Sequence, residues 1–320
     1  MSGSLPGGST PHPALRGASV LTLQEFPPEA VAAVLDTADA LADMPRAQWP
    51  AVLGGRQVAL IFERPSTRTR VSFEVAVNHL GGHAIVLAGR DMQMGRGETV
   101  QDTAKVLSRM VDAIVLRTGP HSTIQELAAH ADVPVINALT YEHHPCQGLA
   151  DVLTVRRRFG DVAGRRVAYV GDGTNCCISL MIAGALSGMQ VVAACPPGYE
   201  PDPDAVAWAN EAGRPLGGGA SAVTDPHVAV ADADAVYTDT WVSMGDEEDA
   251  ARRRRDLADY AIDDALLASA APGAVVLHPL PAHHGEEVTA ELLHGPRSAV
   301  WDQAENRIYA QAALLAHVLG

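Results

Sequence analysis

The stretch Phe62-Glu63-Arg64-Pro65-Ser66-Thr67-Arg68-Thr69-Arg70 decides the interpretation of this chain. It follows an apolar run at residues 58–61 and leads into residues 71–77, so the pattern predicts a strand, a turn and a helix. The turn carries three hydroxyl side chains and three arginines. A helix N-terminus presents backbone N–H groups and the positive end of its dipole, and arginine adds bidentate donors that suit phosphate. The stretch therefore predicts an anion site, with a capped helix start and surface arginines as the alternative.

Length and charge limit the class of protein. A chain of 320 residues with 47% hydrophobic and 19% charged residues fits a globular protein of two domains. Its net charge of -15 argues against nucleic acid or an anionic membrane as a partner. Lys105 is the single lysine, so nearly all positive charge is arginine. A cluster of arginines is a local exception to the negative charge of the chain as a whole, which makes it more informative.

The chain shows no sign of membrane insertion or export. No run approaches the ~18 apolar residues of a membrane span, and residues 1–10 lack the features of a signal peptide. We expect residues 1–18 to form a disordered tail. The spacing of the four cysteines, at 146, 176, 177 and 195, suggests neither zinc nor a disulfide. Reduced core thiols in a cytoplasmic enzyme are the expectation.

Short apolar strands alternate with amphipathic helices along the chain, which predicts an α/β fold of two domains, each a parallel sheet flanked by helices. The expected strands are 57–62, 83–87, 113–116, 133–138, 166–170, 191–194, 235–237 and 274–277. The expected helices include 28–41, 99–110, 147–159, one ending at 188, and 305–319. We expect domains at 1–147 and 148–304, with a C-terminal helix at 305–320 that packs on the first domain.

Polar side chains gather where these strands end, and ligands bind at that edge of open α/β sheets. The first domain offers a cationic, donor-rich set suited to an oxyanion: Ser66, Thr67, Arg68, Thr69, Arg117, His144 and Gln147. The second offers a mixed set with acidic residues nearby, suited to an amine: Asn175, Asp239, Ser243, Met244 and the segment 278–281. The two sets predict an anionic donor that reacts with an amino acceptor.

Four motifs carry a resemblance to a known family. They are Ser66-Thr67-Arg68-Thr69-Arg70, His144-Pro145-Cys146-Gln147, the segment 239–245 and His278-Pro279-Leu280-Pro281. In order and spacing they resemble the motifs of the aspartate/ornithine transcarbamoylase family, from about residue 20 to the end of the chain. The Ser-Met-Gly loop at 243–245 is similar to that of the ornithine branch.

The resemblance implies roles for individual residues. Ser66 to Thr69 would hold the phosphate of carbamoyl phosphate, together with Arg307 and with Gln93 reaching from a neighbouring subunit of a homotrimer. Thr69, Arg117 and His144 would hold the carbamoyl oxygen, and Gln147 the carbamoyl nitrogen. The amino acid would be bound by Asn175, Asp239, Ser243, Met244, Pro279 and Leu280. Arg117, His144 and Asp239 would be the catalytic groups.

The implied reaction moves a carbamoyl group from carbamoyl phosphate to the side-chain amine of ornithine or a related diamino acid. The products are citrulline, or another ureido amino acid, and phosphate, as in arginine biosynthesis. A neutral amine attacks the carbamoyl carbon, an oxyanion forms and phosphate leaves, so we expect no metal, no cofactor and no covalent intermediate. Donors at such an oxyanion are worth about 2.7–4 kcal/mol each.

One departure from the family pattern leaves alternatives open. The ornithine branch ordinarily has His-Cys-Leu-Pro where this chain has Pro279, so a thiol expected beside the loop aspartate is absent. A catalytically weak paralogue that binds carbamoyl phosphate as a partner subunit is therefore one alternative. The other is an NAD-dependent oxidoreductase, because Gly171-Asp172-Gly173 follows a strand, although the third glycine of a dinucleotide motif is missing.

Overall fold

The computed structural model describes residues 5–8, 10–94, 97–242 and 247–320, and it divides into two compact units. The first unit comprises Met1–Leu153 and Glu305–Gly320, and the second comprises Thr154–Ala304. Two helices, α5 (Pro145–Phe159) and α12 (Val300–Leu319), are continuous across the divisions. The first division thus falls within α5, a few residues after the boundary expected from the sequence.

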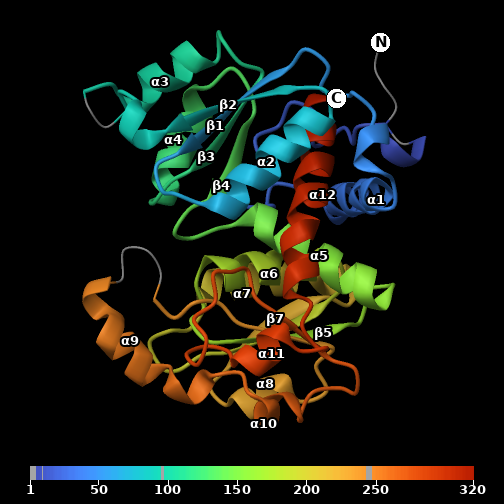
Figure 1. The fold of residues 1–320 in the computed structure, drawn as a ribbon, viewed down its shortest axis with the longest axis vertical. Helices are drawn as coiled ribbons and strands as arrows, with labels where there is room; N and C mark the ends of the chain where they lie inside the picture. Colours follow the sequence, from blue (N-terminus) through green and yellow to red (C-terminus); the bar gives the residue numbers. More distant parts are fainter. Residues whose placement is uncertain (1–4, 9, 95–96, 243–246) are drawn as a thin grey trace. The chain divides into compact units, whose positions relative to one another are not determined.

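The first unit is built on a four-stranded parallel sheet in the order β2-β1-β3-β4 (Figure 1). Its strands are β1 (Gln57–Phe62), β2 (His83–Ala88), β3 (Ala113–Arg117) and β4 (Val135–Leu139). Phe62 at the end of β1 pairs with Arg117 at the end of β3, so both strands finish at the same level. The carboxyl edge of this sheet therefore brings together segments that are far apart in the sequence.

Helices cover the first sheet because its strands are apolar on both sides. The helices that begin in the first unit are α1 (Pro28–Ala42), α2 (Thr67–His79), α3 (Val100–Leu107), α4 (His121–His130) and α5. Ile61 and Leu116 of the sheet pack in one core cluster with Ile124 and Leu127 of α4. Helix α2 contacts β1 and β2, and Figure 1 shows it crossing in front of the sheet.

The second unit has a five-stranded parallel sheet in the order β7-β6-β5-β8-β9. Its strands are β5 (Arg166–Val170), β6 (Gln190–Ala194), β7 (Gly219–Val223), β8 (Ala235–Tyr237) and β9 (Val275–Leu277). Its helices are α6 (Asn175–Ala185), α7 (Pro203–Gly213), α8 (Pro226–Val230), α9 (Ala250–Asp256), α10 (Asp264–Leu267), α11 (Ala290–His294) and the start of α12. The predicted α/β class with two parallel sheets is confirmed.

Several elements differ from the sequence expectation. Strand β7 was not predicted, because its Gly-Ala-Ser-Ala-Val sequence has little apolar character. Helix α3 ends at Leu107 instead of residue 110, and α6 ends at Ala185 instead of residue 188. Helix α12 begins at Val300, five residues before the expected start. Within the described residues, no helix is both long and apolar enough to cross a membrane.

The described part of segment 1–18 packs against the rest of the first unit. Leu5 and Leu15 are buried, and a short 3-10 helix covers Pro6–Gly8. The backbone N–H of His12 donates to Nδ1 of His317 at 3.0 Å, and that of Gly17 donates to a carbonyl in α12 at 2.9 Å. These contacts correct the expectation of a disordered tail for residues 5–8 and 10–18. The segment is rich in glycine and proline, which suggested disorder, but its two leucines, Leu5 and Leu15, are buried in the core of the first unit.

Candidate functional site

The N-terminus of α2 carries the hydroxyl groups that the sequence singled out. Ser66 is the N-cap residue, and its Oγ accepts a hydrogen bond from the backbone N–H of Thr69 at 3.3 Å. Ser66 Oγ also donates to Thr69 Oγ1 at 3.0 Å, and Arg307 of α12 donates to the same atom at 2.9 Å. Thr69 has no exposed surface. The turn and the C-terminal helix thus meet at one buried hydroxyl group.

His144 lies within electrostatic reach of Arg117 and of Arg307, the residue that donates to this hydroxyl group. Arg117 ends β3, and His144 immediately precedes α5; both are buried. Burial lowers the pKa of His144 well below its ordinary value, and the positive charges of Arg307 and Arg117 lower it further. The imidazole is therefore neutral at neutral pH, beside two guanidinium groups. A neutral imidazole between cations can donate one hydrogen bond to an oxyanion without carrying a charge itself.

Gln147 is fixed in the first turn of α5 by a buried carboxylate. Its Nε2 donates to Oδ1 of Asp151 at 2.7 Å, and neither side chain is exposed. The opposite atom, Oε1, is buried and has no hydrogen-bond partner among the described residues. Because Asp151 occupies the amide nitrogen, Gln147 presents an acceptor to the site. The carboxylate of Asp151 therefore decides which end of the amide is available.

The remaining predicted residues of the first unit are more exposed. Thr67 is exposed and Arg68 is half-buried, both in the first turn of α2. Gln93 is exposed, after the 3-10 helix Gly89–Asp91. The structure thus brings together the half-buried Ser66 with four buried residues, which are Thr69, Arg117, His144 and Arg307, while Gln93 is exposed.

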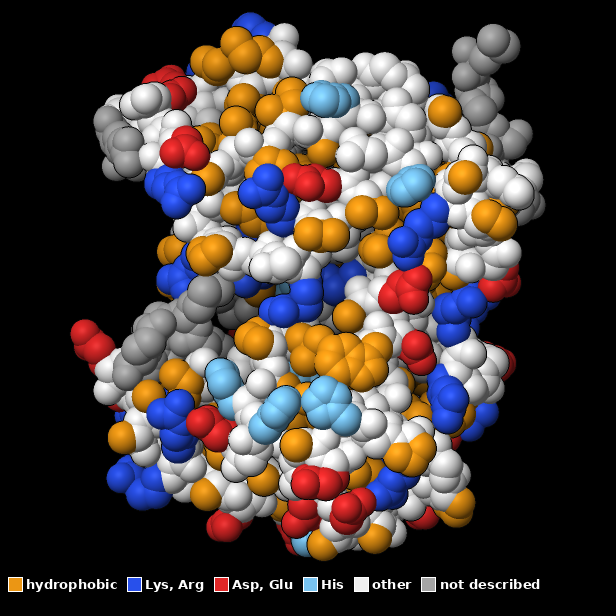
Figure 2. All heavy atoms as spheres, in the orientation of Figure 1, with side chains coloured by type: hydrophobic (Ala, Val, Ile, Leu, Met, Phe, Trp, Pro, Cys, Tyr) orange, Lys and Arg blue, Asp and Glu red, His pale blue; other side chains and the backbone are white. Residues whose placement is uncertain are grey.

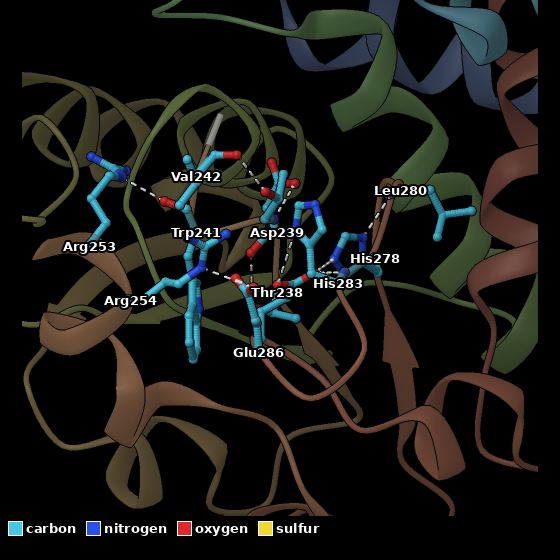
Figure 3. A network of polar contacts seen from close by, with 12 residues as sticks. Thr238, Asp239, Trp241, Val242, Arg253, Arg254, His278, Leu280, His283 and Glu286 are labelled. Atoms are coloured by element: carbon cyan, nitrogen blue, oxygen red, sulfur yellow. Dashed lines mark hydrogen bonds and ion pairs between the residues drawn. The ribbon is translucent and has the colours of Figure 1, made fainter. Parts of the chain in front are cut away.

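In the second unit, Asp239 follows β8 and is the centre of the polar network in Figure 3. Its Oδ1 accepts from the backbone N–H of Thr240 at 2.7 Å, and the thiol of Cys176 hydrogen-bonds to its carboxylate. Burial raises the pKa of Asp239 above its ordinary value, while His278 and these two hydrogen bonds oppose the shift. The Asp239 carboxylate therefore loses contact with water, and the two hydrogen bonds and His278 offset part of that cost.

His278 organises the segment after β9. Its Nδ1 accepts from the backbone N–H of Leu280 at 2.8 Å, and its Nε2 donates to Oε1 of Glu287 at 3.1 Å. The backbone N–H of His278 donates to Oε1 of Gln303 at 2.7 Å. Leu280 has φ of 61°, a left-handed conformation that is costly for leucine, and the imidazole bond holds it there. Pro279 is buried beside it.

The other predicted residues of the second set fall in two classes. Asn175 is the first residue of α6 and is half-buried. Ser243 and Met244 lie outside the described residues. Asn175 follows β5 and Asp239 follows β8. Because these two strands are neighbours in the sheet, both residues lie beyond its carboxyl edge.

The Gly171-Asp172-Gly173 turn after β5 has a structural use. Asp172 forms an ion pair with Arg253, and Nε of Arg253 donates to the carbonyl of Trp241 at 2.6 Å (Figure 3). A Cβ at Gly173 would lie 2.4 Å from the backbone nitrogen of Pro201. This glycine is thus required by a neighbouring chain segment, which accounts for the turn without a dinucleotide.

Family models match both halves of the chain. The carbamoyl-P binding domain of aspartate/ornithine carbamoyltransferase matches residues 18–157, and the Asp/Orn binding domain matches residues 163–318. The chain belongs to the aspartate/ornithine carbamoyltransferase family. The resemblance inferred from the four motifs is therefore confirmed.

Relatives within this carbamoyltransferase family are similar over nearly the whole chain. The ornithine carbamoyltransferase of Acidothermus cellulolyticus is 54% identical over 295 residues, covering 92% of this chain and 94% of its own. That of Pyrococcus abyssi is 48% identical over 307 residues, with 96% and 97% covered. The solved ornithine carbamoyltransferase of Pyrococcus furiosus superposes with a TM-score of 0.92 at 48% identity, covering 96% of this chain and 98% of that one.

Three residues near the predicted site were not assigned to it from the sequence. Asp151 lies one helical turn after Gln147, and that i, i+4 spacing was the available signal. Cys176 was interpreted as a core thiol, and the structure adds its bond to Asp239. Glu287 lies nine residues beyond His278, and no local pattern in the sequence links the two.

Proposed function

We propose that this carbamoyltransferase moves the carbamoyl group of carbamoyl phosphate to the side-chain amine of ornithine, giving citrulline and phosphate. The observation that carries the proposal is the buried cluster at the N-terminus of α2, where Ser66, Thr69 and Arg307 share hydrogen bonds beside Arg117 and His144. The relatives named ornithine carbamoyltransferase, at 48–54% identity, support the choice of acceptor.

In this proposal the first turn of α2 binds the phosphate. Ser66, Thr67, Arg68 and Thr69 would offer hydroxyl groups, backbone N–H groups and a guanidinium at the positive end of the helix dipole. Arg307 would add a second guanidinium, since it already bonds the hydroxyl group of Thr69. Charge-assisted hydrogen bonds of this kind are about twice as strong as neutral ones.

The carbamoyl group would lie beside Arg117, His144 and Gln147. Thr69, Arg117 and the neutral His144 would donate to the carbonyl oxygen, and their donors would strengthen as that oxygen gains charge. The Oε1 atom of Gln147 would accept from the carbamoyl NH2 group, because Asp151 already occupies the other end of the amide. The arrangement favours a carbamoyl group over an acetyl group, which has no N–H to offer.

The acceptor amino acid would be held by Asn175, Asp239, Ser243, Met244, Pro279 and Leu280. An amine with a pKa near ~10.4 is only about 0.1% neutral at pH 7.4, which costs roughly 4 kcal/mol. Asp239, whose pKa is raised by burial, is the group that would receive or relay the proton as the amine attacks the carbamoyl carbon. The C–O bond to phosphate then breaks, and phosphate leaves.

The assembly and location follow from the same proposal. We infer a homotrimer in which the exposed Gln93 reaches the phosphate site of a neighbouring subunit. A cytoplasmic enzyme of arginine biosynthesis fits the reaction, and one relative from Pyrococcus furiosus carries the word "anabolic" in its name. Light scattering tests the trimer: a fully active monomer would contradict it.

A second candidate function rests on Pro279 in place of the cysteine of the ornithine branch. In that case the chain would bind carbamoyl phosphate but transfer its carbamoyl group weakly, as a partner subunit. A carbamoylation screen with ornithine, lysine, putrescine, 2,4-diaminobutyrate and 2,3-diaminopropionate separates the two. Citrulline formation from ornithine as the fastest reaction supports the main proposal. Binding of carbamoyl phosphate without turnover of any amine supports the second.

A further inference from the structure

A histidine and two glutamates converge on one point in the turn that follows Pro281. The three are His283, Glu286 and Glu287, here termed the 283–287 cluster. One potential ligand atom from each lies within 4.8 Å of the other two. The backbone N–H of Glu286 donates to the carbonyl of His283 at 3.0 Å, which closes the turn and brings these side chains to one side. Figure 3 shows His283 and Glu286 in this segment.

In each glutamate of the 283–287 cluster, one carboxylate oxygen accepts hydrogen bonds and the other accepts none from the described residues. Oε1 of Glu286 accepts from Arg254 at 3.0 Å. Oε1 of Glu287 accepts from His278 and, at 2.6 Å, from the backbone N–H of His283. The two Oε2 atoms are buried and have no hydrogen-bond donor among the described residues. The existing bonds therefore fix both carboxylates and leave one oxygen of each for another ligand.

Two such buried oxygens are unfavourable without a cation. An acceptor buried without a donor costs about 1–3 kcal/mol, and a charged one costs more. Glu287 has no exposed side-chain surface at all, so bulk water does not compensate it. The two carboxylates also repel each other, and Arg254 neutralises only Glu286 directly. The cluster has an excess of negative charge and of acceptor atoms.

The position of His283 completes a coordination set. Its Nδ1 lies 3.8 Å from Oε2 of Glu287, which is too long for a hydrogen bond. Two ligands of one tetrahedral zinc ion, with bonds of ~2.0–2.1 Å, lie roughly 3.3 Å apart. A small side-chain rotation of His283, which is partly exposed, would close that difference. An imidazole with two carboxylates suits zinc and similar divalent transition metals better than magnesium or calcium.

We propose that the 283–287 cluster binds one divalent transition-metal ion of the zinc class, through Nδ1 of His283 and the Oε2 atoms of Glu286 and Glu287. Three protein ligands leave a coordination position for water. The carbamoyl transfer proposed above uses no metal, so this site would be additional to it. It adjoins the acceptor segment, because Glu287 also holds His278, which in turn holds Leu280.

Cobalt(II) is the probe that tests this site, since its visible absorption reports coordination geometry directly. The full-length protein, treated with a chelator and then titrated with Co²⁺, should show one saturable tetrahedral absorption band per chain. His283→Ala and Glu286→Gln should each weaken binding. Loss of an outer-shell partner alone costs about 10–100-fold in metal affinity, so loss of a direct ligand should cost at least about that.

The matched controls use the other histidines of the same surface. Figure 2 shows several histidines together on this face, and the rings of His284 and His294 contact each other with centroids 5.5 Å apart. His284→Ala and His294→Ala should leave Co²⁺ binding unchanged. The proposal is overturned if no saturable band appears, or if the His284 and His294 variants lose binding while His283→Ala retains it. Thermal unfolding of each apo variant checks that it is folded.

Discussion

The donor side of the first unit and the acceptor side of the second differ in how their polar groups are held. Around Thr69, side chains of α2, α12 and β3 and that of His144, just before α5, form a largely buried, cationic cluster. Around Asp239, the groups are carboxylates, a thiol and a histidine, and part of the loop that follows, residues 243–246, lies outside the described residues. The first arrangement suits a fixed anion, and the second suits a cationic amine.

This difference indicates where substrate choice resides in the family. The family model that matches the first unit names carbamoyl phosphate alone, so one preformed set of donors suits the ligand on this side. The family model of the other unit names aspartate or ornithine, so the acceptor differs between members. Of the residues proposed to hold the acceptor, most lie in loops after β8 and β9, whereas Asn175 is the first residue of α6. Substitutions on the donor side should therefore abolish binding, whereas those on the acceptor side should shift preference.

The largest effect should come from Arg68→Ala on the donor side. In the proposed complex the Arg68 guanidinium would make charge-assisted hydrogen bonds to the phosphate, each worth about 1.5–3 kcal/mol, so its removal should weaken phosphate binding by about 100-fold or more. Calorimetry with a non-hydrolysable phosphonate analogue of carbamoyl phosphate measures this.

Arg70→Ala is the matched control for Arg68→Ala, because Arg70 lies two residues later in the same helix. Arg70 is exposed and pairs with Glu74 at 3.0 Å on the same helix, a pair worth about 0.3–0.5 kcal/mol. It should leave anion affinity unchanged. Unchanged affinity in Arg68→Ala, or equal losses in both variants, would refute the assignment of the phosphate site to the start of α2.

The next effect tests whether Asp151 orients Gln147. Asp151→Asn retains the shape but removes the charge and offers an amide that can turn Gln147 around. We expect kcat/KM for carbamoyl phosphate to fall about 10- to 100-fold, the loss of one charge-assisted hydrogen bond. The affinity for inorganic phosphate, which has no carbamoyl group, should not change. A parallel loss of phosphate affinity would mean that Asp151 acts on the fold of α5 and not on Gln147.

The sequence predicted on which elements the donor-side residues lie, because the signals for those elements are local. Ser66 caps the helix that it precedes, and Thr69 and Arg68 lie in the first turn of that helix. Arg117 and His144 each stand at the end or the start of an element whose apolar pattern is clear. A motif of this kind implies its own geometry, so residue types and spacing are enough.

Contacts between distant segments could not be predicted in the same way. Glu287 reaches His278 through a turn, and the bond from His12 to His317 spans most of the chain. Strand β7 has no apolar signal of its own and depends on pairing with β6. In each case tertiary packing, and not local preference, determines the position of the residue.

A moderate effect should appear in stability at low pH, where we expect the first unit to lose stability before the second. Burial lowers the pKa of three histidines of the first unit, His121, His144 and His317. Their unfolded forms bind protons more readily, so their stabilising contribution is present above about pH 6.5 and is lost as the pH falls through their lower folded pKa values. Each can contribute a slope of up to about 1.4 kcal/mol per pH unit to the free energy of unfolding.

Hydrogen–deuterium exchange as a function of pH localises this loss. Peptides of α1, which contacts His317 through Thr37 at 2.9 Å and the carbonyl of Ala33 at 3.1 Å, should lose protection on acidification before peptides of β5 and β6. His317→Gln should reduce the pH dependence of α1. Equal acid sensitivity of both units, or an unchanged slope in His317→Gln, would show that these histidines do not control it.

The smallest effect concerns Pro279 on the acceptor side. Proline removes a thiol and a backbone donor at this position, and the only thiol that the described residues offer to Asp239 is that of Cys176. Pro279→Cys should restore one polar partner beside the acceptor amine, worth roughly 0.5–1.5 kcal/mol, and so raise kcat/KM for ornithine about 2- to 10-fold.

Pro279→Ala is the matched control, since it frees the backbone without adding a thiol. A gain in Pro279→Cys alone assigns the effect to sulfur, whereas an equal gain in both variants assigns it to the backbone. If neither variant alters the rate with ornithine or the preference over 2,4-diaminobutyrate, Pro279 does not determine acceptor choice.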